Sequence, residues 1–134
     1  MRSVAAALAL ALLVGGCASR PPACPAGQQR VRTAQLFFGR DVAGRPMVSE
    51  PQFRRFVDDV LTPRFPDGLT ILDGGGQWKG KENKLIRESS KVVLIVLPNT
   101  PDADARLDAV RAAYKQRFSQ DSVLLVTQPA CVSF

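Results

Sequence analysis

The sequence of 134 residues contains no histidine at all. Histidine is the most common general base near neutral pH and the most common transition-metal ligand, so its absence excludes most catalytic triads and zinc sites. No other motif in the sequence requires a bound group. We therefore expect neither a metal ion nor a cofactor.

An apolar run long enough to span a bilayer is also missing. The longest run covers residues 4–14 and follows the short basic start Met1-Arg2-Ser3, whereas a transmembrane helix needs about 20 apolar residues. A short positive start followed by an apolar run of this length is typical of a secretory signal peptide. We predict that residues 1–16 are a signal peptide.

The end of this segment resembles the lipobox of bacterial lipoproteins. Val14 takes the apolar position, Gly15 and Gly16 the small positions, and Cys17 the position of the lipid-carrying residue. The resemblance implies acylation of Cys17 and anchoring of the protein in the cell envelope. Ala18 in place of aspartate implies the outer membrane, facing the periplasm, in a Gram-negative cell. The alternative is ordinary secretory cleavage that leaves a free cysteine.

Cysteine is scarce, with three residues in the chain. Residues 17–30 are rich in proline and are predicted to form a tether ahead of a single domain over residues 31–134. If Cys17 carries lipid, Cys24 and Cys131 remain as a pair in an oxidising compartment, where disulfides form and persist. We expect them to be bonded to each other, with two separate thiols as the alternative.

Neither sign of charge dominates. Lysine and arginine number 18 against 12 acidic residues, for a net charge of +6, and the basic residues are spread along the chain. A solvated surface explains this pattern, and attraction to anionic lipid or glycan is the alternative. Nucleic acid is not an expected partner of an exported protein.

The hydrophobic patterns predict four strands and two helices. Ser49 and Gln52 form a capping box at the start of the first helix, whose apolar face ends before Pro63. The glycines at 74–76 suggest a bulge or a close backbone approach within the second strand. The predicted strands are 33–38, 69–72 (resuming at 77–78), 84–97 and 123–126, and the helices run from Ser49 to Leu61 and from Thr100 to Phe118.

The order β-α-β-β-α-β matches the ferredoxin-like α+β fold, with a four-stranded antiparallel sheet and two helices on one face. The first and last strands are neighbours in this topology, which brings the segments of Cys24 and Cys131 to the same end of the sheet. Apolar residues at 92–97 leave the other face in need of a cover. We expect the sheet of a homodimer partner to cover it, giving an α+β barrel; a ligand or the tether are the alternatives.

Several segments carry a family resemblance: residues 61–70, 73–78, 88–91, 113–118 and 131–134. In these segments the chain resembles the uncharacterised bacterial family DUF3574, over residues 33–134. The resemblance supports the domain limits and implies export. It supplies no activity and no catalytic residue.

One group of polar residues brackets the hairpin of the second and third strands. As an active site, it would use Asp73 or Glu88 as a general acid or base and a cation to stabilise negative charge. The alternative is a turn aspartate with cross-strand ion pairs. The sole tryptophan would stack on a ligand or pack across the hairpin. Besides the two acids, the candidate ligand-binding residues are Arg64, Asp67, Gln77, Trp78, Arg87 and Lys91.

Two functions follow from these patterns. The preferred one is a non-enzymatic envelope lipoprotein, whose sheet face or hairpin binds an envelope protein or a small ligand. The alternative is a small enzyme of the dimeric α+β barrel type that acts on an apolar or aromatic molecule. The lack of histidine favours the first.

Overall fold

The computed structural model describes residues 23–41, 45 and 47–134. None of the helices in this part of the chain is long and apolar enough to cross a bilayer. The predicted signal peptide and Cys17 lie outside the described residues. The elements are β1 (Gln29–Gly39), α1 (Glu50–Phe56), the π-helix η1 (Val57–Leu61), β2 (Thr70–Lys79), the short 3-10 helix η2 (Lys81–Asn83), β3 (Leu85–Val96), α2 (Ala103–Phe118) and β4 (Leu124–Val132).

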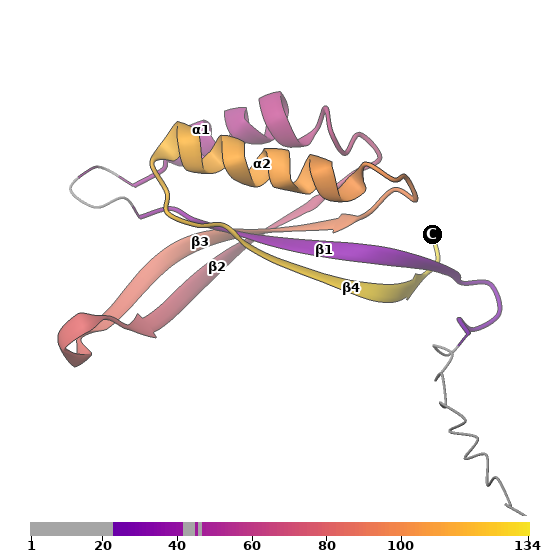
Figure 1. Cartoon of the computed structure of the whole chain (residues 1–134), viewed down its shortest axis with the longest axis horizontal. Helices are drawn as coiled ribbons and strands as arrows, with labels where there is room; N and C mark the ends of the chain where they lie inside the picture. Colours follow the sequence, from indigo (N-terminus) through magenta and orange to yellow (C-terminus); the bar gives the residue numbers. More distant parts are fainter. Residues whose placement is uncertain (1–22, 42–44, 46) are drawn as a thin grey trace, which may run out of the picture.

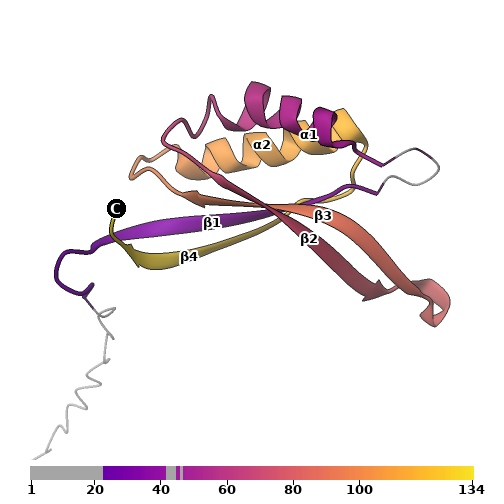
Figure 2. The same ribbon diagram turned by 180° about the vertical axis from the view of Figure 1, so that it is seen from behind.

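The strands form one antiparallel sheet in the order β2-β3-β1-β4. Both helices lie on the same face of this sheet, and no element covers the other face among the described residues (Figures 1 and 2). The predicted ferredoxin-like α+β fold is therefore confirmed. We call the uncovered side the open face.

Alternate residues of β1 point toward the helices and form the centre of the core. Ala34, Leu36 and Phe38 are fully buried. Phe38 packs edge-on against Phe56 and Tyr114, with ring centroids 5.8 and 4.7 Å away. The Tyr114 hydroxyl donates a hydrogen bond of 2.8 Å to the carbonyl oxygen of Gly39, and burial raises the pKa of this hydroxyl. An aromatic cluster thus fastens both helices to the central strand.

The first helix begins as the sequence predicts. The Ser49 side chain accepts a hydrogen bond from the Gln52 amide, and the Gln52 side chain accepts one from the Ser49 amide. After Phe56 the helix widens into η1, where the Thr62 amide bonds to the Val57 carbonyl. The wider turn lets Val57, Val60 and Leu61 all be buried, which explains why the apolar pattern continues to Leu61.

The second strand differs from the prediction because it is continuous. Each residue from Thr70 to Lys79 pairs with one of β3, so the glycines form no bulge. At Gly74 a Cβ atom would lie 2.7 Å from the Ser90 Oγ atom, which is the close approach that the glycines allow. The two strands continue beyond the sheet as a long hairpin that bends away from the helices (Figures 1 and 2).

The apolar end of β3 is buried on one face only. Val93 and Ile95 are buried under the helices, whereas Leu94 on the open face is 36% exposed. Because the two helices cover only one face of the sheet, successive residues of β3 point alternately toward the helices and toward solvent. The same alternation leaves Leu124 exposed on β4.

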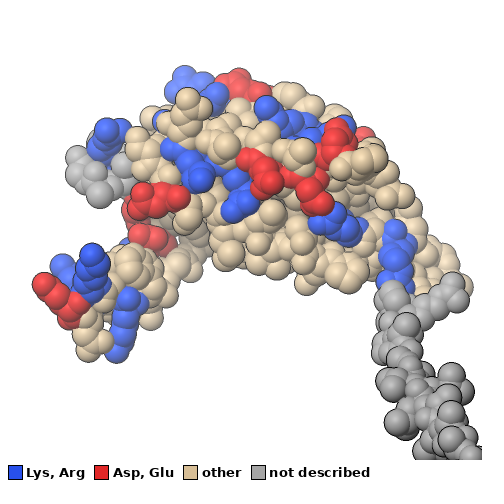
Figure 3. Space-filling view, in the orientation of Figure 1, with Lys and Arg blue, Asp and Glu red and all other residues tan. Residues whose placement is uncertain are grey.

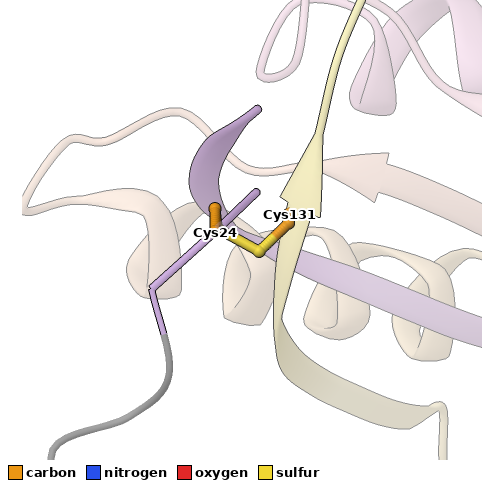
Figure 4. The surroundings of a disulfide bond; sticks show 2 residues. All are labelled: Cys24 and Cys131. Carbon is orange, nitrogen blue, oxygen red and sulfur yellow. A yellow bond between two sulfur atoms is a disulfide. The ribbon is translucent and has the colours of Figure 1, made fainter. Parts of the chain in front are cut away.

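A disulfide joins Cys24 to Cys131, with 5.6 Å between the Cα atoms (Figure 4). Arg30 pairs with Cys131 in the β1–β4 ladder, and a turn at Gly27 (φ +81°) returns the preceding chain to β4. The strand begins at Gln29. The folded domain therefore reaches into the last residues of the segment predicted as a tether.

The disulfide joins two residues that are 107 positions apart in the sequence. Replacing both cysteines (Cys24→Ser with Cys131→Ser) should lower the free energy of unfolding by about 2–4 kcal/mol, because the open chain gains entropy when unfolded. Urea denaturation of the two proteins measures this difference. Reduction of the unchanged protein should give the same loss, and an equal midpoint for all three samples would contradict the expectation.

Candidate functional site

The structure brings together two of the predicted site residues, Asp73 and Lys91. They are direct cross-strand partners, and the Lys91 Nζ atom lies 2.5 Å from the Asp73 Oδ1 atom. Lys91 is on the helix-covered face beside Phe38 and only 6% exposed. The predicted cross-strand ion pair is therefore present.

The second partner of Lys91 could not be predicted from the sequence. The Glu50 Oε1 atom, in the first turn of α1, lies 2.8 Å from both the Lys91 Nζ atom and the Arg40 Nη1 atom. Hydrogen bonding to Asp73 and then to Glu50 raises the pKa of Lys91. The same contacts lower the pKa of Asp73 and of Glu50.

These shifts keep the ammonium and both carboxylates charged near neutral pH. A general acid or base must exchange a proton in that range, so the cluster is poorly suited to proton transfer. Its clear effect is structural, since it ties the start of α1 to the hairpin strands. Asp73 accordingly acts as a partner of Lys91.

The other predicted acid, Glu88, points to the opposite face from Asp73. Glu88 pairs with Gly76, three positions along the ladder from the Asp73–Lys91 pair, and side chains alternate between the faces of a strand. The two carboxylates therefore do not converge. Gln77, Arg87 and Glu88 instead border a depression of about 410 Å³ beside the glycines.

Trp78 lies farther along the hairpin, across from Ile86. Its side chain is 51% exposed. The pairing fits the packing across the hairpin that the sequence suggested, and the exposed half of the ring is free for a further contact.

The remaining two predicted residues lie at the other end of the sheet. The Arg64 Nη1 atom donates to the Val60 carbonyl oxygen at 2.9 Å, and the Arg64 carbonyl accepts from Arg106. Asp67 lies in the turn before β2 and borders a groove. The predicted cluster is thus divided between the two ends of the sheet.

This groove is the larger hollow of the two, with a volume of about 930 Å³. Volumes of 300 to about 1,000 Å³ are typical of sites for small molecules. It lies where β1 starts and β4 ends, between the turn before β2 and the β3–α2 connection. Its lining is a mixture of apolar and polar side chains that includes Arg30, Val31, Asp67, Leu94, Val96, Leu97, Asn99 and Phe134.

One ion pair and one disulfide hold the groove walls. The Arg32 guanidinium donates to both oxygens of Asp104 at 2.8 and 3.2 Å, which connects β1 to α2. This hydrogen bonding lowers the pKa of Asp104. On the other wall, the disulfide joins the chain ahead of Gln29 to β4 between Pro129 and Phe134.

The groove opens on the open face of the sheet. Leu94 and Val96 lie on that face, because the residues between them, Val93 and Ile95, point into the core. Thr70 pairs with Leu94 and shares its side. The groove and the open face are therefore one continuous surface.

Sequence reasoning missed most of this groove. Its residues come from segments that are far apart in the chain and share no motif. Asp67 was the one member found, through its turn. The predicted disulfide was the one signal for the groove, because it placed the residues near Cys24 and Cys131 side by side. No group of three potential metal-ligating acidic or cysteine side chains occurs in the part of the chain that the structure describes.

The family comparison covers the folded domain. A family model described as "Protein of unknown function (DUF3574)" matches residues 33–134, which confirms the resemblance seen in the sequence. No curated protein matches the chain.

The solved structures that are similar to the chain include two of a phage SAM lyase. A phage SAM lyase in its apo state has a TM-score of 0.57 and 18% identity, over 78% of this chain and 90% of the lyase. A phage SAM lyase in complex with S-methyl-5′-thioadenosine has a TM-score of 0.55 and 17% identity, over 87% of this chain and 97% of the lyase. At these identities the likeness establishes a shared fold.

The non-enzymatic interpretation preferred from the sequence is contradicted by these structures, since both are of an enzyme. The expectation that the chain is not an enzyme is corrected with it. The inference relied on the absence of histidine, which excludes only those mechanisms that use an imidazole.

The Asp73–Lys91 pair predicts how stability depends on pH. A carboxyl whose pKa is lowered by folding stabilises the protein above its unfolded pKa of about 4, and this contribution is lost as the pH falls through the folded pKa. Asp73→Asn should therefore lower stability at pH 7 and reduce the further loss on acidification. Urea midpoints measured from pH 7 down to pH 2 test this.

Asp58→Asn, at an exposed position on η1, is the matched control and should leave the acid profile close to that of the unchanged protein. Parallel profiles for Asp73→Asn and the unchanged protein would show that the pair does not contribute to stability.

Proposed function

Since the chain belongs to the family described as "Protein of unknown function (DUF3574)", we propose from its geometry that the domain is a small enzyme. Its substrate is a small molecule with an aromatic or apolar part. The binding site is the groove at the end of the sheet, bordered by Asp67, Leu94 and Phe134.

The volume and lining of the groove carry this proposal. About 930 Å³ accommodates a molecule the size of a nucleoside. Leu94 and Val96 offer an apolar surface, and Phe134 offers an aromatic ring that is 98% exposed. An exposed phenylalanine at the edge of a hollow is well suited to stack on a flat ligand.

The similar structures suggest which small molecules to test first. One contains S-methyl-5′-thioadenosine, and both are described as SAM lyases. S-Methyl-5′-thioadenosine combines a flat purine with a ribose and a thioether. The purine suits the apolar lining and Phe134, and the ribose hydroxyls suit the carboxylate of Asp67. We therefore propose an adenosyl thioether or sulfonium compound as the substrate class.

Asp67 is assigned the polar role in this site. It is the one acidic side chain among the described residues that line the groove. A carboxylate at that position would hold a ligand hydroxyl and accept a proton where the reaction releases one. Arg32 would take no direct part, because Asp104 occupies its guanidinium.

Binding and turnover test the proposal directly. The full chain should bind S-methyl-5′-thioadenosine in isothermal titration calorimetry and convert S-adenosylmethionine to a new product, followed by chromatography. Phe134→Ala should weaken binding by about 2- to 10-fold, the equivalent of one aromatic contact. Asp67→Asn should lower kcat/KM by about 100-fold or more.

Gln116→Ala is the control, because Gln116 is exposed on α2 in the helix layer, and it should retain full affinity and turnover. If the unchanged chain neither binds S-methyl-5′-thioadenosine nor converts S-adenosylmethionine, the substrate class is refuted. Binding that survives Phe134→Ala and Asp67→Asn would place the site elsewhere.

We also propose that the chain is exported and anchored to the envelope through Cys17. Support comes from the signal pattern of residues 1–16 and from the Cys24–Cys131 disulfide, a bond that persists in oxidising compartments. A membrane is then a partner of the protein through its lipid. In a Gram-negative cell the outer membrane, facing the periplasm, is the expected location.

Metabolic labelling with radioactive palmitate in a Gram-negative host tests the anchor. The unchanged chain should incorporate label and fractionate with the envelope, and Cys17→Ser should abolish both. Cys24→Ser is the matched control, which should remain labelled. Equal labelling of the two variants, or none in the unchanged chain, would rule out acylation at Cys17.

A further inference from the structure

We propose that a second copy of this chain covers the open face of the sheet and closes the groove beneath it. The first part concerns the assembly of the domain. The second part, enclosure of the groove as a substrate site, rests on the proposed function. The partner is identified from the composition, shape and charge of the open face.

The cross-strand pairing places the side chains of the open face in rows. One row consists of Leu72, Val92, Phe37 and Leu124, which are successive partners across all four strands. This row is entirely apolar. Leu72 is 53% exposed and Leu124 is 58% exposed at its two ends.

The next rows continue the same surface. Thr70, Leu94, Gln35 and Val126 form the second row, with Leu94 36% and Val126 39% exposed. The third row contains Val96, Thr33 and Gln128. All these residues are uncharged, so the three rows form a mostly apolar patch of the kind that is covered in stable proteins.

The charge distribution favours an identical partner. The face shown in Figure 3 carries charged side chains of both signs over the helix layer and at the hairpin tip, whereas the three rows of the open face contain no charged residue. Burying those charged side chains in an interface would cost desolvation free energy. Two copies of the open face meet without this cost, and a two-fold axis makes one patch complementary to itself.

The hairpin projects on the same side of the sheet as the open face. It bends away from the helices and thus toward the side of the open face (Figures 1 and 2). Trp78 lies on the same side of β2 as Leu72, because the two are an even number of positions apart. Its half-exposed ring is therefore available to the copy that packs on the open face.

A second copy would also change the groove. Thr70, Leu94 and Val96 line the groove and belong to the open face at once. A sheet packed at about 10 Å over the open face would convert the open groove into a cavity with a lid supplied by the partner. Exclusion of water in such a cavity strengthens the polar contacts of a bound substrate.

Sedimentation equilibrium of the full chain, in a density-matched detergent at micromolar concentration, measures its mass. We expect twice the mass of one chain, as mass spectrometry gives it for the same sample. Leu124→Glu should shift the mass to that of one chain, because the new charge would be buried between two sheets. Ala112→Glu, on the exposed side of α2, is the matched control and should stay dimeric.

Crosslinking identifies the face without relying on a weakened variant. Leu94→Cys should give a dimer with a short bis-maleimide, and Gln116→Cys on the helix layer should give none beyond that of the unchanged chain. Thermal melting of Leu124→Glu at its exposed site checks that this variant folds. A monomeric unchanged chain, or a dimer that survives Leu124→Glu and crosslinks through Gln116→Cys, would overturn the interface.

Ligand binding separates this inference from the proposed function. A dimer through the open face that fails to bind S-methyl-5′-thioadenosine refutes the substrate class and leaves the interface in place. A monomer that binds it refutes the interface and leaves the substrate class. If both hold, Leu124→Glu should bind S-methyl-5′-thioadenosine at least about 10-fold more weakly, since its groove stays open; equal affinity would refute the enclosure.

Discussion

The pairing of β1 with both β3 and β4 determines almost everything else in this molecule. Because β1 lies in the sheet with a neighbour on each side, its alternate residues Ala34, Leu36 and Phe38 must be buried by the helices. The residues between them are then committed to the other face. The core, the open face and the groove are consequences of one register.

The same register explains why much of the fold could be predicted from the sequence. The helix start at Ser49 follows from a local capping box, and the strands from local runs of β-prone residues. The strand order then implied that Cys24 and Cys131 meet, which the structure bears out. These features depend on nearby residues or on a single topological rule.

Other features depend on which distant residues happen to meet, and a single sequence does not contain that information. Glu50 was recognisable as a first-turn acid, but its contact with Lys91 requires the helix to lie across the sheet at a particular angle. Three glycines in a row usually interrupt a strand, but this hairpin is continuous. Glycine is needed at position 74 because a Cβ atom there would meet the Ser90 side chain. The groove is assembled from chain ends and loops, so only Asp67 was found in advance.

The position of the disulfide also gives the domain two unlike ends. The disulfide holds Cys24 against Cys131, at the end of the sheet where the groove lies. The hairpin projects from the other end (Figure 1). Anything fixed to the N-terminal side would hold the groove near the point of attachment and direct the hairpin outward. One covalent bond thus places the N-terminal side of the domain at the groove and opposite the hairpin.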